Sequence, residues 1–252
     1  MQPIYARLRE RACQIVSTFP RPVFYQEQSR AYDFSKVFFK NDPTIKKLHG
    51  FVSDHLKDNF GHGLQHAVKV SVDAGALLYI EGQNFGYDKP MLARRMQVVQ
   101  CAGLLHDIKR RKKEHAKLGA ARAREILKEY PLAPDDIEDV YWAIRNHEAF
   151  KKEILITISQ GALVSDCLYD ADKFRWGPDN FTDTLWDMIS YYNPPLSKFM
   201  ARYPQGMEGL EKIKTTFRTQ TGKKYGPRFI DLGLAIGQKL YEVIQTEFSD
   251  CL

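Results

Sequence analysis

Histidines gather in the middle of this chain of 252 residues, which holds seven in all. The central ones are His62, His66, His106, His115 and His147. His62 and His66, in GHGLQHAVKV, have the four-residue spacing that places two imidazoles on one helix face, as in zinc-binding HxxxH pairs. The residue after His62 is Gly and not the Glu of a zinc protease, which excludes that enzyme class. His62 could equally lie in the turn before the helix, with only His66 directed inward.

A carboxylate directly follows one of these histidines. The stretch CAGLLHDIKRRKKEHAKLGA, residues 101–120, passes from apolar residues into His106 and Asp107. Neighbouring positions on a helix diverge by about 100°, which suits two adjacent ligand positions of an octahedral metal. Imidazole and carboxylate together favour a hard or borderline divalent ion over a thiolate site. The sequence therefore indicates a divalent-metal site near the end of an apolar helix.

Five consecutive cations, Lys109 to Lys113, follow the His-Asp pair. A run of like charge usually forms a solvated face, and that interpretation stays open for Arg111 to Lys113. Directly beyond two metal ligands, one or two of these side chains could also meet an anionic substrate.

The candidate ligands must be positioned by the elements around them. The apolar residues of these elements recur with helical spacing almost throughout the chain. Residues 64–81 form an amphipathic helix that carries His66, and a helix from about Pro90 is expected to run to His106. Further helices are predicted over residues 4–17, 43–58, 114–129, 135–147 and 154–170, with two or three more over 181–252, the last covering about 227–247 from Pro227. The clearest β-branched run, ILITIS at 154–159, lacks a partner strand.

These elements predict an all-α fold in a single domain over residues 1–252. We expect an N-terminal helical extension over 1–45, a core over 46–180 and C-terminal helices over 181–252. The length is ample for one large hydrophobic core.

Composition narrows the class of protein. The net charge of +6 and the pI near 9.0 are mildly basic, which suits an anionic small molecule, a membrane surface or nucleic acid. No recognised nucleic-acid motif accompanies the charge, so nucleic acid is not an expected partner. The four cysteines form no CxxC pair, which favours a reducing compartment. With no signal peptide and no apolar run near the roughly 18 residues of a membrane span, a cytoplasmic protein without membrane association is expected.

Nucleotide-binding loops of the common kinds are absent from the sequence. Thr221-Gly222-Lys223-Lys224 is similar to the end of a P-loop, but Phe217 stands where that loop requires Gly. No GxGxxG and no GxSxG occurs, so a dinucleotide fold and a serine nucleophile elbow are excluded.

The order of the candidate ligands resembles the HD-domain metal-dependent phosphohydrolases, whose pattern is His, His-Asp and Asp across a helical bundle. The matching segments are HGLQHAVKV, GLLHDIKR and VSDCLYDADKFRWG, and the resemblance covers about residues 60–176. The metal ligands that it implies are His66, His106, Asp107 and Asp172. Asp172 is chosen because DADKF matches the segment that carries the family's last ligand. Asp170 is the fallback, and Asp166 is a poorer choice.

The resemblance also assigns roles to the remaining histidines. His115, His147 and His62 are implied as ligands of a second metal or as phosphate contacts. A surface position for His115 and helix capping by His147 are the alternatives. Relatives often have H-D-[IL]-G-[KR], whereas this chain has Lys109 in place of the Gly and keeps the cation at Arg110.

The activity implied by the resemblance is hydrolysis of a phosphate ester by metal-activated water. Asp107 would bind metal and orient the water, and Arg110 would stabilise charge on the phosphate oxygens. Lys109, Arg110 and Lys173 would contact the substrate, which is expected to be a nucleotide or a related phosphorylated small molecule. The aromatic residues beside the last ligand could stack a nucleobase or pack in the core. They are Tyr169, Phe174 and Trp176.

The expected cofactor is one or two divalent ions per chain, from Mn, Fe, Co, Ni, Mg or Zn, and a homo-oligomer is compatible with the sequence. Two other functions stay open. Some HD-fold relatives use a His-rich dinuclear site as diiron oxygenases. A regulatory HD module could bind a nucleotide through the basic run without turnover.

Overall fold

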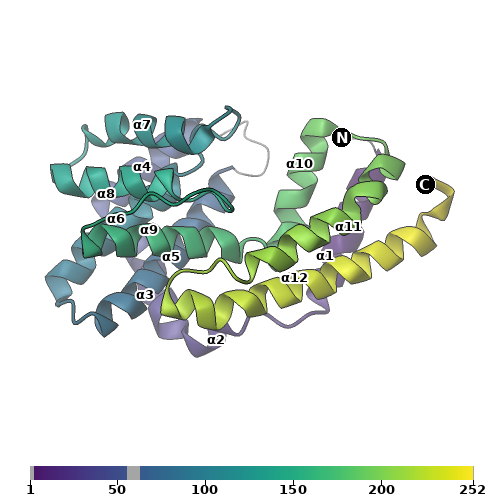
Figure 1. Cartoon of the computed structure of the whole chain (residues 1–252), viewed down its shortest axis with the longest axis horizontal. Helices are drawn as coiled ribbons and strands as arrows, with labels where there is room; N and C mark the ends of the chain where they lie inside the picture. Colours follow the sequence, from purple (N-terminus) through teal and green to yellow (C-terminus); the bar gives the residue numbers. More distant parts are fainter. Residues whose placement is uncertain (1–2, 56–62, 252) are drawn as a thin grey trace.

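The computed structural model describes residues 3–55 and 63–251, which form helices and loops without a strand (Figure 1). The helices are α1 (Pro3–Ser17), α2 (Phe24–Glu27), α3 (Ser29–Asn41), α4 (Pro43–His55), α5 (Leu64–Asn84), α6 (Lys89–Leu105), α7 (His115–Leu127), α8 (Pro134–Arg145), α9 (Ser159–Phe174), η1 (Asn180–Thr184), α10 (Leu185–Tyr192), α11 (Leu196–Ile213), α12 (Gln220–Glu247) and η2 (Ser249–Cys251). The all-α prediction is confirmed. None of the described helices combines the length and the apolar composition needed to cross a lipid bilayer.

The helix α5 lies at the centre of the bundle and packs against α6, α9 and α3. Its residues 70–78 are buried without interruption, so every face of that stretch is covered by neighbouring helices. A helix that is buried on all sides is positioned by its partners and not by the boundary with solvent. This position fixes the first turn of α5, which carries His66.

The contact between α5 and α6 is unusually close at Gly103. A Cβ atom on Gly103 would lie 2.6 Å from the Cα of Ser71 and 2.9 Å from its backbone nitrogen. Only glycine allows the two backbones to approach this closely. The contact holds the end of α6, where His106 lies, against α5.

The predicted helix over 154–170 is wrong at its beginning, because α9 begins at Ser159. The side chain of Asn146 accepts a hydrogen bond from the backbone nitrogen of Ile154 at 3.0 Å and donates one to its carbonyl at 2.9 Å. Both backbone groups of Ile154 are therefore engaged outside a helix. Residues 154–158 of the ILITIS run form neither helix nor strand, and Ser159 begins α9.

The last long helix also begins earlier than predicted. The helix α12 begins at Gln220 and contains Pro227 in its interior. The hydroxyl of Thr219 accepts a hydrogen bond from the backbone nitrogen of Gly222 at 2.8 Å, which is an N-cap. The capped start sets the beginning of the helix, and Pro227 does not.

The two terminal regions pack on each other and on the central helices. In Figure 1, α1, α10, α11 and α12 lie together on the side away from α7 and α8. The helix α1 contacts α12 and η1, and α12 contacts α9 and α5. Buried apolar side chains from Tyr5 to Phe248 form one continuous cluster. The predicted division of a single domain at residues 45 and 180 stays a prediction.

Candidate metal centre

The ends of five helices meet at the first turn of α5. His66 lies in the first turn of α5, His106 and Asp107 directly follow α6, His115 begins α7, His147 follows α8, and Asp172 lies in the last turn of α9. The structure therefore brings six of the predicted site residues together. The remaining histidine of the prediction, His62, lies outside the described residues.

His66 is in contact with two of the other groups. Its Nε2 lies 3.2 Å from Nε2 of His106 and 3.3 Å from Oδ1 of Asp172. Nε2 of His106 lies 3.6 Å from Oδ2 of Asp107. Two imidazole nitrogens and two carboxylates thus face a common point.

Asp107 presents its other oxygen to a second pair of imidazoles. Its Oδ1 lies 3.5 Å from Nε2 of His147 and 3.8 Å from Nε2 of His115. Two groups of possible metal ligands result, one of His66, His106 and Asp107 and the other of Asp107, His115 and His147, each with ligand atoms within 4.8 Å of one another. Asp107 belongs to both groups.

Two of the histidines are oriented by the same local contact. Nδ1 of His106 lies 2.7 Å from the carbonyl oxygen of Gly103, and Nδ1 of His147 lies 2.6 Å from that of Ile144. Carbonyls in the last turn of a helix lack a helical partner and are free to accept. An Nδ1–H that donates to each carbonyl leaves Nε2 with its lone pair directed into the site, the tautomer that a metal ligand needs.

Burial sets the charge of the imidazoles. It lowers the pKa of His106 to about 4 and that of His115 to about 4. Both rings are therefore neutral near pH 7, and a neutral ring can donate its lone pair to a metal. Burial alone would raise the pKa of Asp172, but Lys173 and His66 hold the pKa of this carboxyl well below its usual range.

These residues fit a divalent cation. Nε2 of His147 is buried and accepts no hydrogen bond from any described residue, although the Asp107 carboxylate is close. The neutral imidazoles of His106 and His115 and the buried carboxylates of Asp107 and Asp172 offer the nitrogen and oxygen donors that a divalent cation binds. The donor set of nitrogen and oxygen atoms suits Mn, Fe, Co, Ni or Zn.

Two of the predicted substrate contacts line the cavity in front of the metal centre. Nη1 of Arg110 donates a hydrogen bond to Nε2 of His115 at 2.9 Å and lies 3.7 Å from Oδ1 of Asp107. Nζ of Lys173 lies 2.5 Å from Oδ2 of Asp172. Both cations lie beside the candidate ligands. Lys109 is half-buried and is not among the described residues that line this cavity.

The alternative aspartates of α9 have other partners. Oδ1 of Asp170 accepts a hydrogen bond from the backbone nitrogen of Arg218, and Oδ2 accepts one from that of Thr219, both at 2.8 Å. Asp170 therefore anchors the start of α12. Asp166 is directed toward Arg218, whose Nη1 is 3.8 Å from its Oδ1. Asp172 is the aspartate of this helix that faces the histidines.

The cavity itself has a volume of about 440 Å³. Its walls include Glu148, Arg175 and Trp176, and residues from η1 and α10 complete it. Sequence reasoning missed Glu148, although a carboxylate directly after a candidate ligand was a usable signal. It also missed Arg175, for which the sequence carried no signal, because only the fold brings the end of α9 to this wall.

The three aromatic residues near the last ligand lie in different surroundings. Phe174 stacks on Phe229 in the core, with ring centroids 4.2 Å apart. The guanidinium of Arg218 covers the ring of Tyr169 at 3.8 Å. Only Trp176 of the three lines the cavity.

The comparison with protein families agrees with this geometry. The model of the HD domain family matches residues 63–175, the segment that holds both groups of candidate ligands. No curated protein and no solved structure matches the chain. Members of this superfamily are mostly metal-dependent hydrolases. The match covers the segment for which the sequence predicted a resemblance to the HD-domain superfamily, and that prediction is confirmed.

Proposed function

We propose that this protein is a metal-dependent phosphohydrolase that acts on a nucleotide or a related phosphorylated small molecule. The observation that carries the proposal is the position of Asp107. Its two oxygens face two separate groups of imidazoles, and the cavity that it lines also holds the cations Arg110, Lys173 and Arg175. A metal centre with cationic side chains beside it is an arrangement that stabilises the charge of phosphoryl transfer.

The primary metal would be held by His66, His106, Asp107 and Asp172. When bound, a divalent metal would supply a water of lowered pKa and positive charge for the phosphate oxygens. The side chain of Asp107 would bind the metal and orient this water. Lys173 beside Asp172 would bind a non-bridging oxygen of the phosphate.

The second group of ligands would hold a second metal only after a rearrangement of Arg110. Its guanidinium already donates to Nε2 of His115, which is the atom that a metal would use. Arg110 therefore takes the place of a second cation in the present arrangement. In a mononuclear enzyme it would turn toward the substrate phosphate, and in a dinuclear enzyme it would be displaced outward.

The size and lining of the cavity support a small substrate. A volume of about 440 Å³ is within the usual range for small-molecule sites, about 300–1,000 Å³. Trp176 offers an indole face near Lys173, with Nζ 5.8 Å from the ring centroid. A planar group such as a nucleobase would pack on this face while its phosphate meets the cations.

The test is phosphate release from a panel of nucleotides and phosphate esters with Mn²⁺, Co²⁺, Ni²⁺, Fe²⁺, Zn²⁺ or Mg²⁺. We expect hydrolysis with at least one metal, and its loss in EDTA and in Asp107→Ala. Lys173→Ala should raise KM, because it removes a phosphate contact and leaves the ligands in place.

Two outcomes would contradict the proposal. Two irons per chain with oxygen consumption and no phosphate release would indicate an HD-fold oxygenase, which the His-rich second group would also suit. Nucleotide binding without turnover under every metal would indicate a regulatory HD module.

A further inference from the structure

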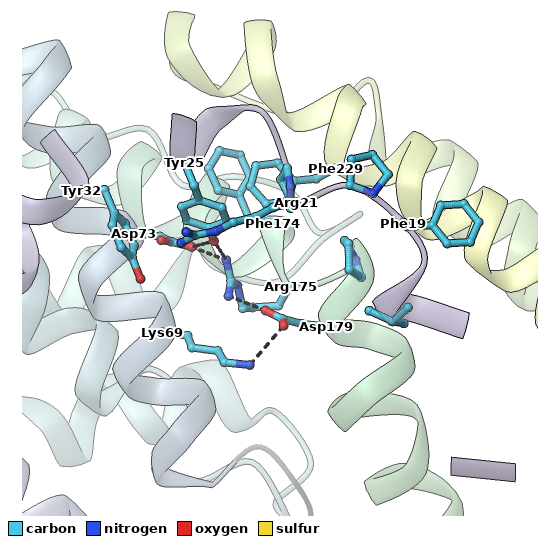
Figure 2. A pocket seen from close by; sticks show the side chains of 14 residues that line it. Phe19, Arg21, Tyr25, Tyr32, Lys69, Asp73, Phe174, Arg175, Asp179 and Phe229 are labelled. Atoms are coloured by element: carbon cyan, nitrogen blue, oxygen red, sulfur yellow. Dashed lines mark hydrogen bonds and ion pairs between the residues drawn. The ribbon is translucent and has the colours of Figure 1, made fainter. Parts of the chain in front are cut away.

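A second hollow surface, separate from the metal cavity, lies between the N-terminal helices and α5. One part of it is a pocket of about 350 Å³, shown in Figure 2. Aromatic rings line this part, which we name the aromatic pocket: Phe19, Tyr25, Tyr32, Phe174 and Phe229. Arg21 lies at its edge, with its guanidinium 4.6 Å from the ring centroid of Tyr25.

The adjoining part is a groove of about 410 Å³ along α3, α4 and α5. Four lysines and one histidine line it, and we name it the lysine groove: Lys36, Lys40, Lys46, Lys69 and His49. Phe39, Val68 and Val72 form its apolar floor. Tyr32 and Lys69 line both the groove and the aromatic pocket, so the two parts adjoin.

The carboxylates of this surface are already neutralised. The aromatic pocket contains Asp73 and Asp179. Arg175 binds Asp73 and also Asp179, the latter at 2.5 Å, and Lys69 binds Asp179 at 3.1 Å (Figure 2). No carboxylate is found among the described residues that line the lysine groove.

The remaining cations have no such partners. Lys36, Lys40 and Lys46 are exposed, and none forms an ion pair with a described residue, nor does Arg21. Three unpaired lysines around one groove create a positive potential that attracts anions. An adjoining pocket with aromatic walls suits a planar group.

We propose that this surface is a binding site for a nucleoside polyphosphate. The base occupies the aromatic pocket beside the ring of Tyr32, and the polyphosphate lies along the lysine groove. Each part has the volume of a small-molecule site, about 300–1,000 Å³. The site does not depend on the proposed hydrolysis, because none of the metal ligands lines it.

The test is calorimetric titration of the EDTA-treated protein, in which no metal-dependent hydrolysis occurs. The probes are ATP, GTP, inorganic triphosphate and adenosine. We expect the nucleoside triphosphates to bind most tightly, inorganic triphosphate more weakly and adenosine weakest. Binding should weaken as KCl is raised, because salt screens exposed charge.

Variants locate the two parts of the ligand. The double substitution Lys36→Ala and Lys40→Ala should raise the Kd of both kinds of triphosphate by about tenfold or more, since it removes two charge-assisted contacts. Tyr32→Ala should raise the Kd of the nucleoside triphosphates and leave that of inorganic triphosphate unchanged. The matched control is Lys89→Ala with Lys198→Ala, which removes the same charge from exposed positions on α6 and α11.

The proposal is overturned by any of three results. These are no measurable binding of any triphosphate, equal weakening in the lysine variant and its control, or loss of binding in Arg110→Ala with Lys173→Ala alone. The last result would place the ligand in the metal cavity, which would support the proposed function and exclude the second site.

Discussion

At the scale of single residues, the candidate centre depends on Asp107 more than on any other side chain. It is 3% exposed, and its two oxygens lie near Nε2 of His106 and Nε2 of His147. The two groups of ligands share this one carboxylate. A substitution here therefore acts on both groups, whereas a change at His115 acts on one.

Asp107→Ala is expected to abolish binding of all divalent metal. Substitution of a residue that only orients a ligand already lowers metal affinity by about 10- to 100-fold. Loss of a shared ligand should therefore lower it by more than about 100-fold. His115→Ala should leave metal binding by the other group, which contains His66 and His106, intact. Metal content by mass spectrometry and titration with Mn²⁺ measure both effects.

The matched control is Asp135→Asn, an exposed carboxylate at the start of α8. It should leave metal content unchanged. If Asp107→Ala keeps its full metal content, the assignment of the centre is wrong.

A second residue-scale prediction concerns pH. Burial raises the pKa of Asp166 to about 6, although Arg218 opposes the rise. In the unfolded chain this carboxyl has a pKa of about 3.9. Between these values the folded state binds more protons than the unfolded state, so the free energy of unfolding falls as pH rises from about 4 to about 6. Above about pH 6 the free energy of unfolding no longer changes through the titration of this carboxyl.

Asp166→Asn removes this titration. The variant should gain stability relative to the wild type as pH rises through that window, and the difference should level off above about pH 7. Urea unfolding at a series of pH values measures the difference. A difference that is flat from pH 4 to 8 would show that Asp166 is ionised throughout in the folded protein.

At the scale of elements, the approach of α5 and α6 controls the metal centre. Gly103 touches the backbone of Ser71, and its carbonyl accepts the Nδ1–H of His106. The same residue therefore sets the distance between two helices and the direction of a ligand. His66 and His106 remain 3.2 Å apart only while the helices stay this close.

Gly103→Ala is expected to push α6 away from α5, because the added Cβ would meet backbone atoms that cannot rotate aside. Overpacking of this kind costs about 1–3 kcal/mol of stability, and metal affinity should fall with it. Chemical denaturation and Mn²⁺ titration report the two effects.

The control substitution is Gly50→Ala in α4, where a Cβ would have no atom within 4 Å. It should raise stability by about 0.8–1 kcal/mol, because Gly is a poor helix residue, and leave metal binding unchanged. Equal effects at the two glycines would mean that the close contact is unimportant.

At the scale of the whole molecule, the terminal helices complete the hydrophobic core around residues 63–175. Phe24 of α2 and Phe229 of α12 pack on Phe174 of α9, with centroid distances of 5.3 Å and 4.2 Å to Phe174. Arg175 follows in the chain and lines both the metal cavity and the aromatic pocket. Residues from both ends of the sequence thus support the last ligand helix.

Phe229→Ala is expected to destabilise the whole chain by about 3–5 kcal/mol, as for other buried Phe side chains. Because the core is continuous, unfolding should remain one transition at a lower temperature. Differential scanning calorimetry tests this, together with the predicted single domain. Two separate transitions, with only one moved by Phe229→Ala, would show that the C-terminal helices unfold independently.

The sequence by itself determined the fold class and the candidate ligands. Helical periodicity is a local property, and it predicted the bounds of α5 and α6 to within a few residues. The pattern of His66, His106-Asp107 and Asp172 was recognisable because each segment is short and contiguous. The start of α9 was missed, since it depends on the side chain of Asn146, and the start of α12 was missed, since its cap is tied to Asp170.

Only the tertiary structure decided which of these residues lie together and which partners each of them contacts. It separated Asp172 from Asp170, because one faces the histidines and the other accepts backbone hydrogen bonds. It gave Asp107 two groups of neighbours and brought Arg175 to the cavity wall. The physical reason is that contacts between segments far apart in the chain depend on how the helices pack, and local periodicity carries no information on that packing.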